Sequence, residues 1–336
     1  MANPSEKGDG HVTNAQYHAS EVQTMTFQKM KKAVTLYVEH LQSLHRSQNT
    51  ISTYRASISS LIQWMENNGC KDNQEVTGET ITKWRNFLHD KGNSQNTILS
   101  RVLTIHTFFA WCIRQKITEE NVVSTDDIPP LEHREITLLD SEDIDKLLHV
   151  IPSRTHKNIS LRTRAIVIFA LQTGLRNSEI RELTLDDLDF EHGWVLVKHG
   201  KGNKRRKAPF PKFAQECVKD YLNSGIRPSW VKSSDILFGN NKVGSKYDKN
   251  AWHAYSSQQI NLSVKRYVKN VTGKEIHLHT LRHCATALWD SRGVPIRTIQ
   301  NALGHNSIRT TENVYLYVLN KNQSAMEINS ALENME

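Results

Sequence analysis

Four short segments in the second half of the chain combine cationic or imidazole side chains with residues that form backbone turns. The first is Thr-Gly-Leu-Arg176, in which the arginine follows a glycine break between two helical patterns, and Glu179 lies one turn into the second pattern. An acid at this spacing can hold a guanidinium rigid from behind. The same pair on a surface would be an ordinary ion pair of little energetic value, and the segment alone fits that interpretation better.

The second segment, residues 199–207, has five Lys or Arg residues in nine positions and two glycines. We expect it at the tip of a hairpin, between the strand-like residues 193–198 and the extended residues 208–211. The glycines would let Lys201 reach out from a tight turn. The segment can straddle a phosphate backbone or be a solvated charged loop; its remaining cations are Lys204, Arg205, Arg206 and Lys207.

The third segment is His277-Leu-His279-Thr-Leu-Arg282-His283-Cys284. His279 and Arg282 are three residues apart, so at the start of a helix they share a face. The pair would combine an imidazole with a bidentate oxyanion binder. A metal site is the alternative, because three histidines and a cysteine fall within eight residues. However, no carboxylate or Cys-x-x-Cys pair completes a ligand set, so we expect no metal here.

The fourth segment begins with Leu-Gly-His305 and leads into a predicted helix that carries Tyr315 and Tyr317. A tyrosine in a helix usually belongs to a core or an interface, so this segment alone does not indicate a nucleophile.

Helical patterns dominate the first half of the chain. Apolar residues recur at three- and four-residue steps over residues 27–44, from residue 47 to 65, and over 81–88 and 98–113. The phrase Ser-Gln-Asn-Thr-Ile starts the second and the fourth patterns; it suggests either an internal duplication or, as we prefer, two similarly capped helix starts. The N-terminus of a helix can also bind phosphates. We therefore expect DNA contacts from the polar residues of these two helix starts: Ser47, Asn49, Thr50, Ser94, Asn96 and Thr97.

The second half mixes helices with a short strand pattern. Residues 122–136 contain two adjacent prolines and no apolar period, as a linker would. Helices are expected at 139–150, 161–173, 212–223, 256–271, 279–291, 296–302 and 310–319. The chain is therefore predicted to be mainly α: a flexible tail (1–21), an N-terminal helical domain (22–121), the linker (122–136), a C-terminal mixed α/β domain with a small antiparallel sheet (137–319) and a C-terminal helix (320–336).

The amino-acid composition excludes some classes of protein and favours others. Lys and Arg exceed Asp and Glu by 43 to 35, a net charge of +8 that favours a polyanionic partner. The longest apolar run, residues 165–171, is far too short to span a membrane, and no export signal is recognisable. The four cysteines are scattered, which indicates free thiols in the cytoplasm. A membrane protein and a secreted disulfide scaffold are excluded.

In this order, the four segments resemble the tyrosine recombinase (phage integrase) family. The matching motifs are Thr-Gly-Leu-Arg176, Gly-Lys201-Gly, His279-x-x-Arg282 and Leu-Gly-His305, followed by a tyrosine. The resemblance covers about residues 137–318, and the helical first half is similar to the family's core-binding, SAM-like domain. Because His305 stands where Cre-type enzymes have a tryptophan, the sequence looks closest to the Xer-like and simple integrase branches.

The family resemblance leaves two tyrosines to choose between. Tyr315 lies ten residues after His305 and Tyr317 twelve, whereas many members place the nucleophile nine residues on, where this chain has Val314. Some members have the ten-residue spacing, and Tyr315-Leu-Tyr-Val resembles their Tyr-Thr-His-Val ending. We therefore predict Tyr315 as the nucleophile, with Tyr317 as the second choice.

The resemblance implies a site-specific DNA recombinase or integrase that uses no metal, cofactor or ATP. Tyr315 would attack the scissile phosphate and form a 3′-phosphotyrosine. Its helpers would be Arg176 and Arg282 on the phosphate oxygens, Lys201 as the acid for the leaving 5′-oxygen, His279 as proton acceptor or phosphate donor, His305 as a further donor, and Glu179 as their support. A type IB topoisomerase-like relaxing enzyme and a catalytically silent DNA-binding protein are the alternatives.

Partners follow from the same resemblance. We expect a double-stranded recombination site, a homotetramer on two duplexes, a cytoplasmic, nucleoid-associated location, a role with mobile genetic elements and, in some reactions, accessory DNA-bending factors. The acidic C-terminal segment supports assembly, because its apolar residues share one helical face. We predict that this helix packs on a neighbouring protomer; packing on its own domain is the alternative. The apolar residues are Ala325, Met326, Ile328, Leu332 and Met335.

Overall fold

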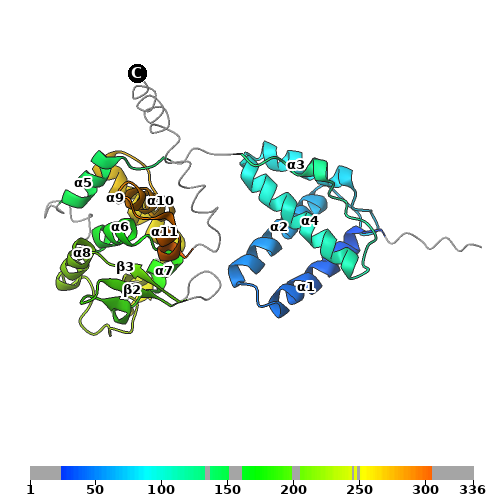
Figure 1. Cartoon of the computed structure of the whole chain (residues 1–336). Helices are drawn as coiled ribbons and strands as arrows, with labels where there is room; N and C mark the ends of the chain where they lie inside the picture. Colours follow the sequence, from blue (N-terminus) through cyan, green and yellow to red (C-terminus); the bar gives the residue numbers. More distant parts are fainter. Residues whose placement is uncertain are drawn as a thin grey trace, which may run out of the picture. The chain divides into compact units, whose positions relative to one another are not determined.

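The computed structural model describes residues 24–132, 137–150, 161–198, 205–243, 246–247 and 250–304, without the side chains of 242–249. The chain divides into two compact units, Met1–Arg134 and Glu135–Glu336 (Figure 1). Both are mainly helical, and a small antiparallel sheet lies in the second unit, which confirms the predicted fold class. The predicted tail (1–21), the helix at 310–319 and the C-terminal helix (320–336) lie outside the described residues.

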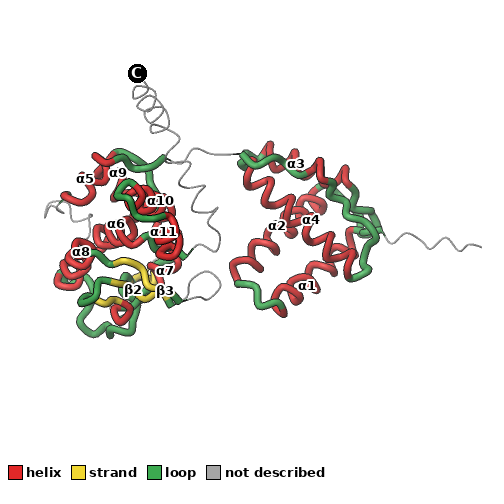
Figure 2. The backbone as a smooth tube through the Cα atoms, viewed as in Figure 1, coloured by secondary structure: helices red, strands yellow, loops and turns green. Residues whose placement is uncertain are grey.

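The N-terminal unit consists of the four predicted helices. They are α1 (Phe27–Ser43), α2 (Gln48–Asn67), α3 (Gly78–Asp90) and α4 (Gln95–Arg114) (Figure 2). Their apolar faces meet in one core, in which Met30, Ile58, Trp84 and Phe108 are fully buried. The helical period of the sequence thus places these side chains inside because each helix buries a single stripe.

Both copies of the repeated Ser-Gln-Asn-Thr-Ile phrase start a helix. Ser47 and Ser94 are the N-caps of α2 and α4, and their hydroxyl oxygens accept hydrogen bonds from the amides of Thr50 (3.2 Å) and Thr97 (3.3 Å). The shared phrase is therefore explained by the same capping chemistry at two helix starts.

The first part of the predicted linker is folded onto the N-terminal unit. Val123 is buried in the core, and the backbone oxygen of Asp127 accepts a hydrogen bond from Arg85 Nη1 (3.0 Å). The Asn96 amide binds Glu132 in both directions, donating to its carbonyl (2.8 Å) and accepting from its amide (3.0 Å). The chain is thus attached to α3 and α4 as far as residue 132.

The C-terminal unit is built around one buried helix. In α6 (Leu161–Thr173), residues 165–171 are 0–1% exposed, and helices surround it in Figure 1. All the predicted helices among the described residues are present, together with the short α7, the helical pattern expected after the Gly174 break. The other helices are α5 (Ser141–His149), α7 (Asn177–Glu182), α8 (Lys212–Asn223), α9 (Ser257–Thr272), α10 (Leu278–Asp290) and α11 (Ile296–Leu303).

A three-stranded antiparallel sheet contains the predicted hairpin. Its strands are β1 (Leu188–Asp189), β2 (Trp194–Val197) and β3 (Arg206–Pro209), in that order. Val197 pairs with Arg206 at the end of the hairpin next to the connection between the strands, so the connecting basic segment begins directly after β2. Two further strand pairs were not predicted; each strand has two residues, too few for an alternating pattern. They are β4 (Gly239–Asn240) with β7 (His253–Ala254) and β5 (Lys242–Val243) with β6 (Lys246–Tyr247).

No helix among the described residues combines the length and the apolar character needed to cross a bilayer.

Gly174 ends α6 in a crowded left-handed conformation. Its φ is +63°, and a Cβ atom there would lie 2.7 Å from Leu303 Cδ2 and 3.1 Å from the Trp289 ring. Gly273, after α9, has a similar φ of +77° but no atom within 4 Å of the same position. Substitutions at both glycines would introduce backbone strain, but only the substitution at Gly174 would also introduce a steric clash.

We predict that Gly174→Ala lowers the free energy of unfolding more than Gly273→Ala does. Backbone strain alone costs about 1 kcal/mol, which is the change expected for Gly273→Ala. Gly174→Ala adds overpacking and should cost roughly 2–4 kcal/mol in total. Urea unfolding followed by circular dichroism measures both changes, and equal losses would contradict close packing at Gly174.

Candidate functional site

The predicted residues of α7 and α10 meet at the end of α11. Arg282, in the second turn of α10, is 2% exposed. Its Nη1 donates to the carbonyl oxygen of Gly174 (2.6 Å), and its Nη2 donates to that of Leu303 (2.8 Å). The guanidinium therefore joins the end of α6 to the end of α11.

Arg176 lies at the junction between α6 and α7, where its side chain is 23% exposed. Its Nη1 donates to Glu179 Oε1 (2.9 Å), its backbone amide donates to Glu179 Oε2 (2.8 Å), and its Nη2 donates to the carbonyl oxygen of Gly304 (3.0 Å). The predicted pairing of Arg176 and Glu179 is thus present, and it is half-buried and locked by the backbone.

Glu179 has a second partner that the sequence did not identify. Arg206 Nη1 donates to Oε1 (2.7 Å) and Nη2 donates to Oε2 (2.8 Å), a bidentate pair in which the Glu179 side chain is 1% exposed. Burial alone would raise the pKa of Glu179, but the hydrogen bonds and charges of Arg206 and Arg176 hold it below its ordinary value. The carboxylate is therefore ionised.

The C-terminal end of α11 is an acceptor for all three arginines. The carbonyl oxygen of Ala302 accepts from Arg206 Nε (2.9 Å), and those of Leu303 and Gly304 accept from Arg282 and Arg176. This end of a helix carries partial negative charge, so cations are stabilised there. Gly304 has φ +66°, and a Cβ atom on it would lie 3.0 Å from Arg206 Cδ.

Two histidines of α10 stand beside the arginines. The partly exposed His279 and the half-buried His283 have ring centroids 4.5 Å apart in an edge-on arrangement. Burial and the nearby charge of Arg282 lower the pKa of His279, and burial and His279 lower the pKa of His283 to about 4. Both rings are therefore neutral at pH 7, the form in which an imidazole accepts a proton.

The cluster retains positive charge. Burial, then the charge of Arg176, lowers the pKa of Arg282 to about 9, which still leaves it protonated at pH 7. Three guanidiniums face one carboxylate, so the group of Arg176, Arg206, Arg282 and Glu179 has a net charge of +2. Such a cluster suits an anion with several oxygens, for which the planar guanidinium is well shaped.

Nothing in the described part of the chain forms a metal-ligand cluster of three or more His, Cys, Asp or Glu side chains. Cys284, from the candidate metal segment, lies in the core, where its sulfur accepts a hydrogen bond from the amide of Leu139 (3.5 Å). All four cysteines are free, as predicted.

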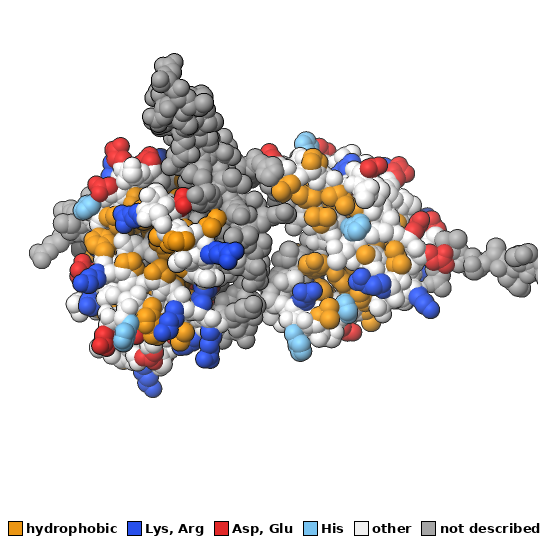
Figure 3. Space-filling model, in the orientation of Figure 1, with side chains coloured by type: hydrophobic (Ala, Val, Ile, Leu, Met, Phe, Trp, Pro, Cys, Tyr) orange, Lys and Arg blue, Asp and Glu red, His pale blue; other side chains and the backbone are white. Residues whose placement is uncertain are grey.

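The described basic residues of the hairpin differ in their exposure to solvent. Arg205 and Lys207 are exposed, and Lys207 Nζ lies 3.8 Å from the centre of the Trp194 ring. Arg206, expected among the phosphate contacts, instead turns inward to Glu179, because β3 already begins at this residue. On the face shown in Figure 3, Lys and Arg side chains are frequent over the part of the C-terminal unit that holds β2 and β3.

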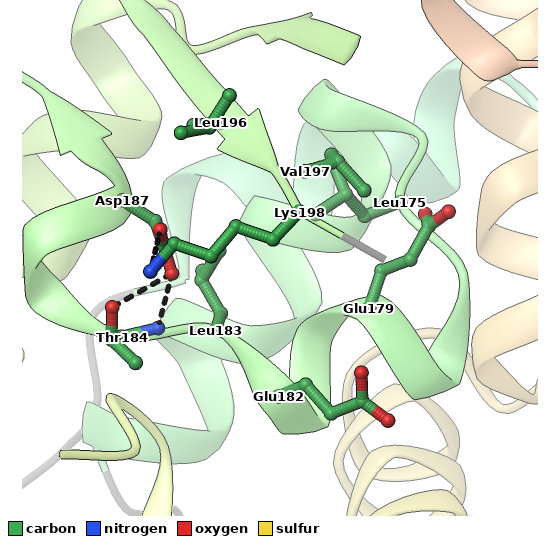
Figure 4. A pocket seen from close by; sticks show the side chains of 9 residues that line it. All are labelled: Leu175, Glu179, Glu182, Leu183, Thr184, Asp187, Leu196, Val197 and Lys198. Carbon is green, nitrogen blue, oxygen red and sulfur yellow. Dashed lines mark hydrogen bonds and ion pairs between the residues drawn. The ribbon is translucent and has the colours of Figure 1, made fainter. Parts of the chain in front are cut away.

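An ion pair in a pocket beside α7 and β2 anchors the hairpin at the end of β2 (Figure 4). Lys198 Nζ lies 2.7 Å from Asp187 Oδ1, and the Asp187 side chain is only 3% exposed. Asp187 Oδ2 also accepts from the amide (3.0 Å) and the hydroxyl (2.7 Å) of Thr184. Lys198 directly precedes the basic segment 199–207 in the sequence, so this ion pair fixes the residue from which that segment starts. No local pattern in the sequence pointed to the pair.

Other predicted site residues are spread over the chain. Asn49 is exposed at the start of α2, whereas the Asn96 amide is already engaged by Glu132. The hydroxyls of Ser47 and Ser94 contact those of Thr50 (2.8 Å) and Thr97 (2.9 Å). Four predicted residues lie outside the described part of the chain: Lys201, Lys204, His305 and Tyr315.

Comparisons with known proteins cover both units. Residues 137–322 match the family described as "Phage integrase family", and residues 34–116 match "Phage integrase, N-terminal SAM-like domain". Tyrosine recombinase XerC of Bacillus subtilis (strain 168) is 29% identical over 87% of this chain and 93% of its own length. Tyrosine recombinase XerD of Halalkalibacterium halodurans is 30% identical over 83% of this chain and 91% of its own length.

Solved structures share the fold. A lambda integrase dimer bound to a COC′ core site matches with a TM-score of 0.64 and 16% identity, covering 87% of this chain and 96% of that one. The XerH site-specific recombinase, in a post-cleavage complex with a palindromic difH substrate, matches with a TM-score of 0.64 and 18% identity, covering 93% of this chain and 86% of that one.

We predict that both α10 histidines titrate below their ordinary range in the folded protein, with His283 protonated only near pH 4. Histidines of an unfolded chain titrate near pH 6.5, so as the pH falls below this value the unfolded state binds protons first and the folded state loses stability. NMR titration of the ring protons measures the pKa values. His283→Gln should flatten the pH dependence of unfolding, and titration of both rings near pH 6.5 would contradict the prediction.

Proposed function

Because the chain belongs to the phage integrase family and is a tyrosine recombinase of the Xer type, we propose that it cleaves and rejoins DNA at specific sites through a covalent 3′-phosphotyrosine intermediate. The observation that carries this proposal is the cluster of Arg176 and Arg282, fixed by Glu179 and by the carbonyl oxygens that end α11. It offers guanidiniums in a preorganised arrangement, as the transition state of phosphoryl transfer requires.

In the proposed reaction, the Tyr315 oxygen attacks the scissile phosphorus and the bond to the 5′-oxygen breaks. Arg176 and Arg282 bind the non-bridging oxygens, whose negative charge grows in the transition state. The neutral His279 ring takes the tyrosine proton or donates to the phosphate. From the family motifs, Lys201 protonates the leaving 5′-oxygen and His305 adds a donor.

The covalent intermediate conserves the bond energy of the cleaved phosphodiester. The phosphodiester bond is exchanged for a phosphotyrosine bond, so a free 5′-hydroxyl can reverse the attack without ATP. If that hydroxyl belongs to a second duplex, the strands are exchanged. Two cleavages in each of two duplexes imply four protomers, the assembly that we propose on DNA, with accessory DNA-bending factors where a reaction needs them.

DNA contacts in this proposal come from both units. Arg205 and Lys207 are exposed beside the site, and Lys204 belongs to the same turn. The starts of α2 and α4 supply the N-terminal contacts, namely Ser47, Asn49 and Thr50 with Ser94, Asn96 and Thr97. Cationic contacts with phosphates position the protein and make binding salt-dependent, while base contacts define the site. We place the protein on the nucleoid, acting on chromosomal sites or mobile genetic elements.

We predict that Tyr315→Phe abolishes covalent attachment to DNA and leaves DNA affinity within about twofold, because the lost hydroxyl is needed only for attack. The full-length protein is mixed with nicked fragments of its own genome and denatured in SDS, and the attached DNA is recovered and sequenced. Tyr317→Phe is the matched control, which should retain attachment through a 3′-phosphate.

Loss of attachment in Tyr317→Phe alone would move the nucleophile to Tyr317. Salt-sensitive DNA binding without any covalent product from the unchanged protein would contradict the proposed chemistry. Relaxation of plasmids that lack the recovered site would contradict site specificity.

We predict that deletion of residues 320–336 weakens cooperative binding to a two-site DNA by about tenfold or more, because linked protomers share an effective concentration. Binding to a single half-site should not change. Gel-shift titrations of both DNAs measure the two affinities, and unchanged cooperativity with unchanged strand exchange would place this segment on its own protomer.

A further inference from the structure

Among the described basic residues of the hairpin, Arg206 is the one that faces away from solvent. Its side chain is 11% exposed, whereas Arg205 and Lys207, on either side of it, are exposed. With the described residues, its side chain makes hydrogen bonds inside the protein: two go to the Glu179 carboxylate and one to the carbonyl oxygen of Ala302. A contact with a DNA phosphate does not explain this placement.

The Glu179 carboxylate is saturated by its two arginines. Oε1 accepts from Arg176 Nη1 and Arg206 Nη1, and Oε2 accepts from the Arg176 amide and Arg206 Nη2. A carboxylate has about four lone-pair sites, so each site is occupied and the group cannot rotate without breaking bonds. Arg206 supplies half of these bonds, and Arg176 takes its position from the other half.

Arg206 also joins the hairpin to α7 and to the end of α11. It lies in β3, where it pairs with Val197 of β2, and it binds Glu179 in α7 and Ala302 at the end of α11. The open side of Gly304 faces its aliphatic stem, because a Cβ atom there would be 3.0 Å from Arg206 Cδ. The side chain therefore fills the space between the hairpin and the end of α11.

We propose that Arg206 is a positioning residue for strand cleavage: it fixes the Glu179 carboxylate and thereby the orientation of Arg176. This inference rests on the proposed function of Arg176 as a phosphate binder. The role requires a guanidinium, because only a planar fork donates to both carboxylate oxygens and to Ala302 at the same time. A lysine keeps the charge but makes one point contact.

The test compares Arg206→Lys, Glu179→Gln and the double variant in covalent complex formation under single-turnover conditions. The probe is a nicked duplex carrying the site recovered by covalent trapping, at saturating concentration. Arg206→Lys should slow attachment on the order of 10- to 100-fold, as expected for a misplaced group, with DNA affinity within about twofold. Because Arg206 acts through Glu179, the double variant should be no slower than Glu179→Gln alone.

Arg227→Lys is the matched control for the loss of a buried guanidinium. Arg227 is 9% exposed and donates to the carbonyl oxygens of Val231 (2.7 Å) and Lys232 (2.5 Å), remote in sequence from the cluster. Its replacement should lower stability without slowing attachment by the folded protein. The double variant Arg227→Lys/Glu179→Gln should form the covalent complex at the same rate as Glu179→Gln alone.

A measurement without DNA separates this inference from the proposed function. Loss of the fork should speed hydrogen exchange at the Arg176 amide, which donates to Glu179 Oε2, and Arg227→Lys should not. If the unchanged protein forms no covalent product, the proposed function fails while exchange still tests the positioning. The inference would be overturned if Arg206→Lys formed the covalent complex at the normal rate, or if its slowing were additive with that of Glu179→Gln. It would also be overturned if weaker DNA binding explained the defect, or if hydrogen exchange at the Arg176 amide did not change.

Discussion

Repulsion between three buried or half-buried guanidiniums is the constraint around which the C-terminal unit is arranged. Burial lowers the pKa of Arg282 most, and the nearby charges of Arg176 and Arg206 lower it further. One carboxylate, Glu179, and three successive carbonyl oxygens at the end of α11 offset this repulsion. The cluster is therefore stable only when α6, α7, β3, α10 and α11 are all docked, and the fold and the site form together.

The same constraint fixes where the chain leaves α11. Gly304 ends the helix with φ +66° while its carbonyl oxygen is bound to Arg176, so backbone direction and hydrogen bonding are set at one residue. His305 follows directly in the sequence, and Tyr315 follows ten residues later. Anchoring of α11 thus defines the starting point of the segment that carries the proposed nucleophile, at the place where the arginines proposed to bind the phosphate are held.

Much of this arrangement could be predicted from the sequence, because it depends on local patterns. Apolar period and capping serines located the helices of the N-terminal unit, and three-residue spacing paired Arg176 with Glu179. The inward turn of Arg206 could not be predicted, since its partner is 27 residues away and its neighbours are similar cations. The acceptors at the end of α11 are backbone atoms, which leave no residue-type signal, and the anchoring of Lys198 by Asp187 likewise depends on tertiary packing.

Holding arginines mainly with carbonyl dipoles has an electrostatic consequence for catalysis. A separate carboxylate for every guanidinium would fix the positions equally well but would cancel the charge. Among the described residues, Glu179 is the one carboxylate bonded to Arg176 and Arg206, and Arg282 is held by the carbonyl oxygens of Gly174 and Leu303, so this cluster keeps a charge of +2. Partial burial, together with the same positive field, lowers the pKa of the neighbouring His279 and keeps its ring neutral at pH 7. In the proposed reaction, a site prepared in this way would stabilise the negative charge that develops on a phosphate and would still have a base available to accept a proton.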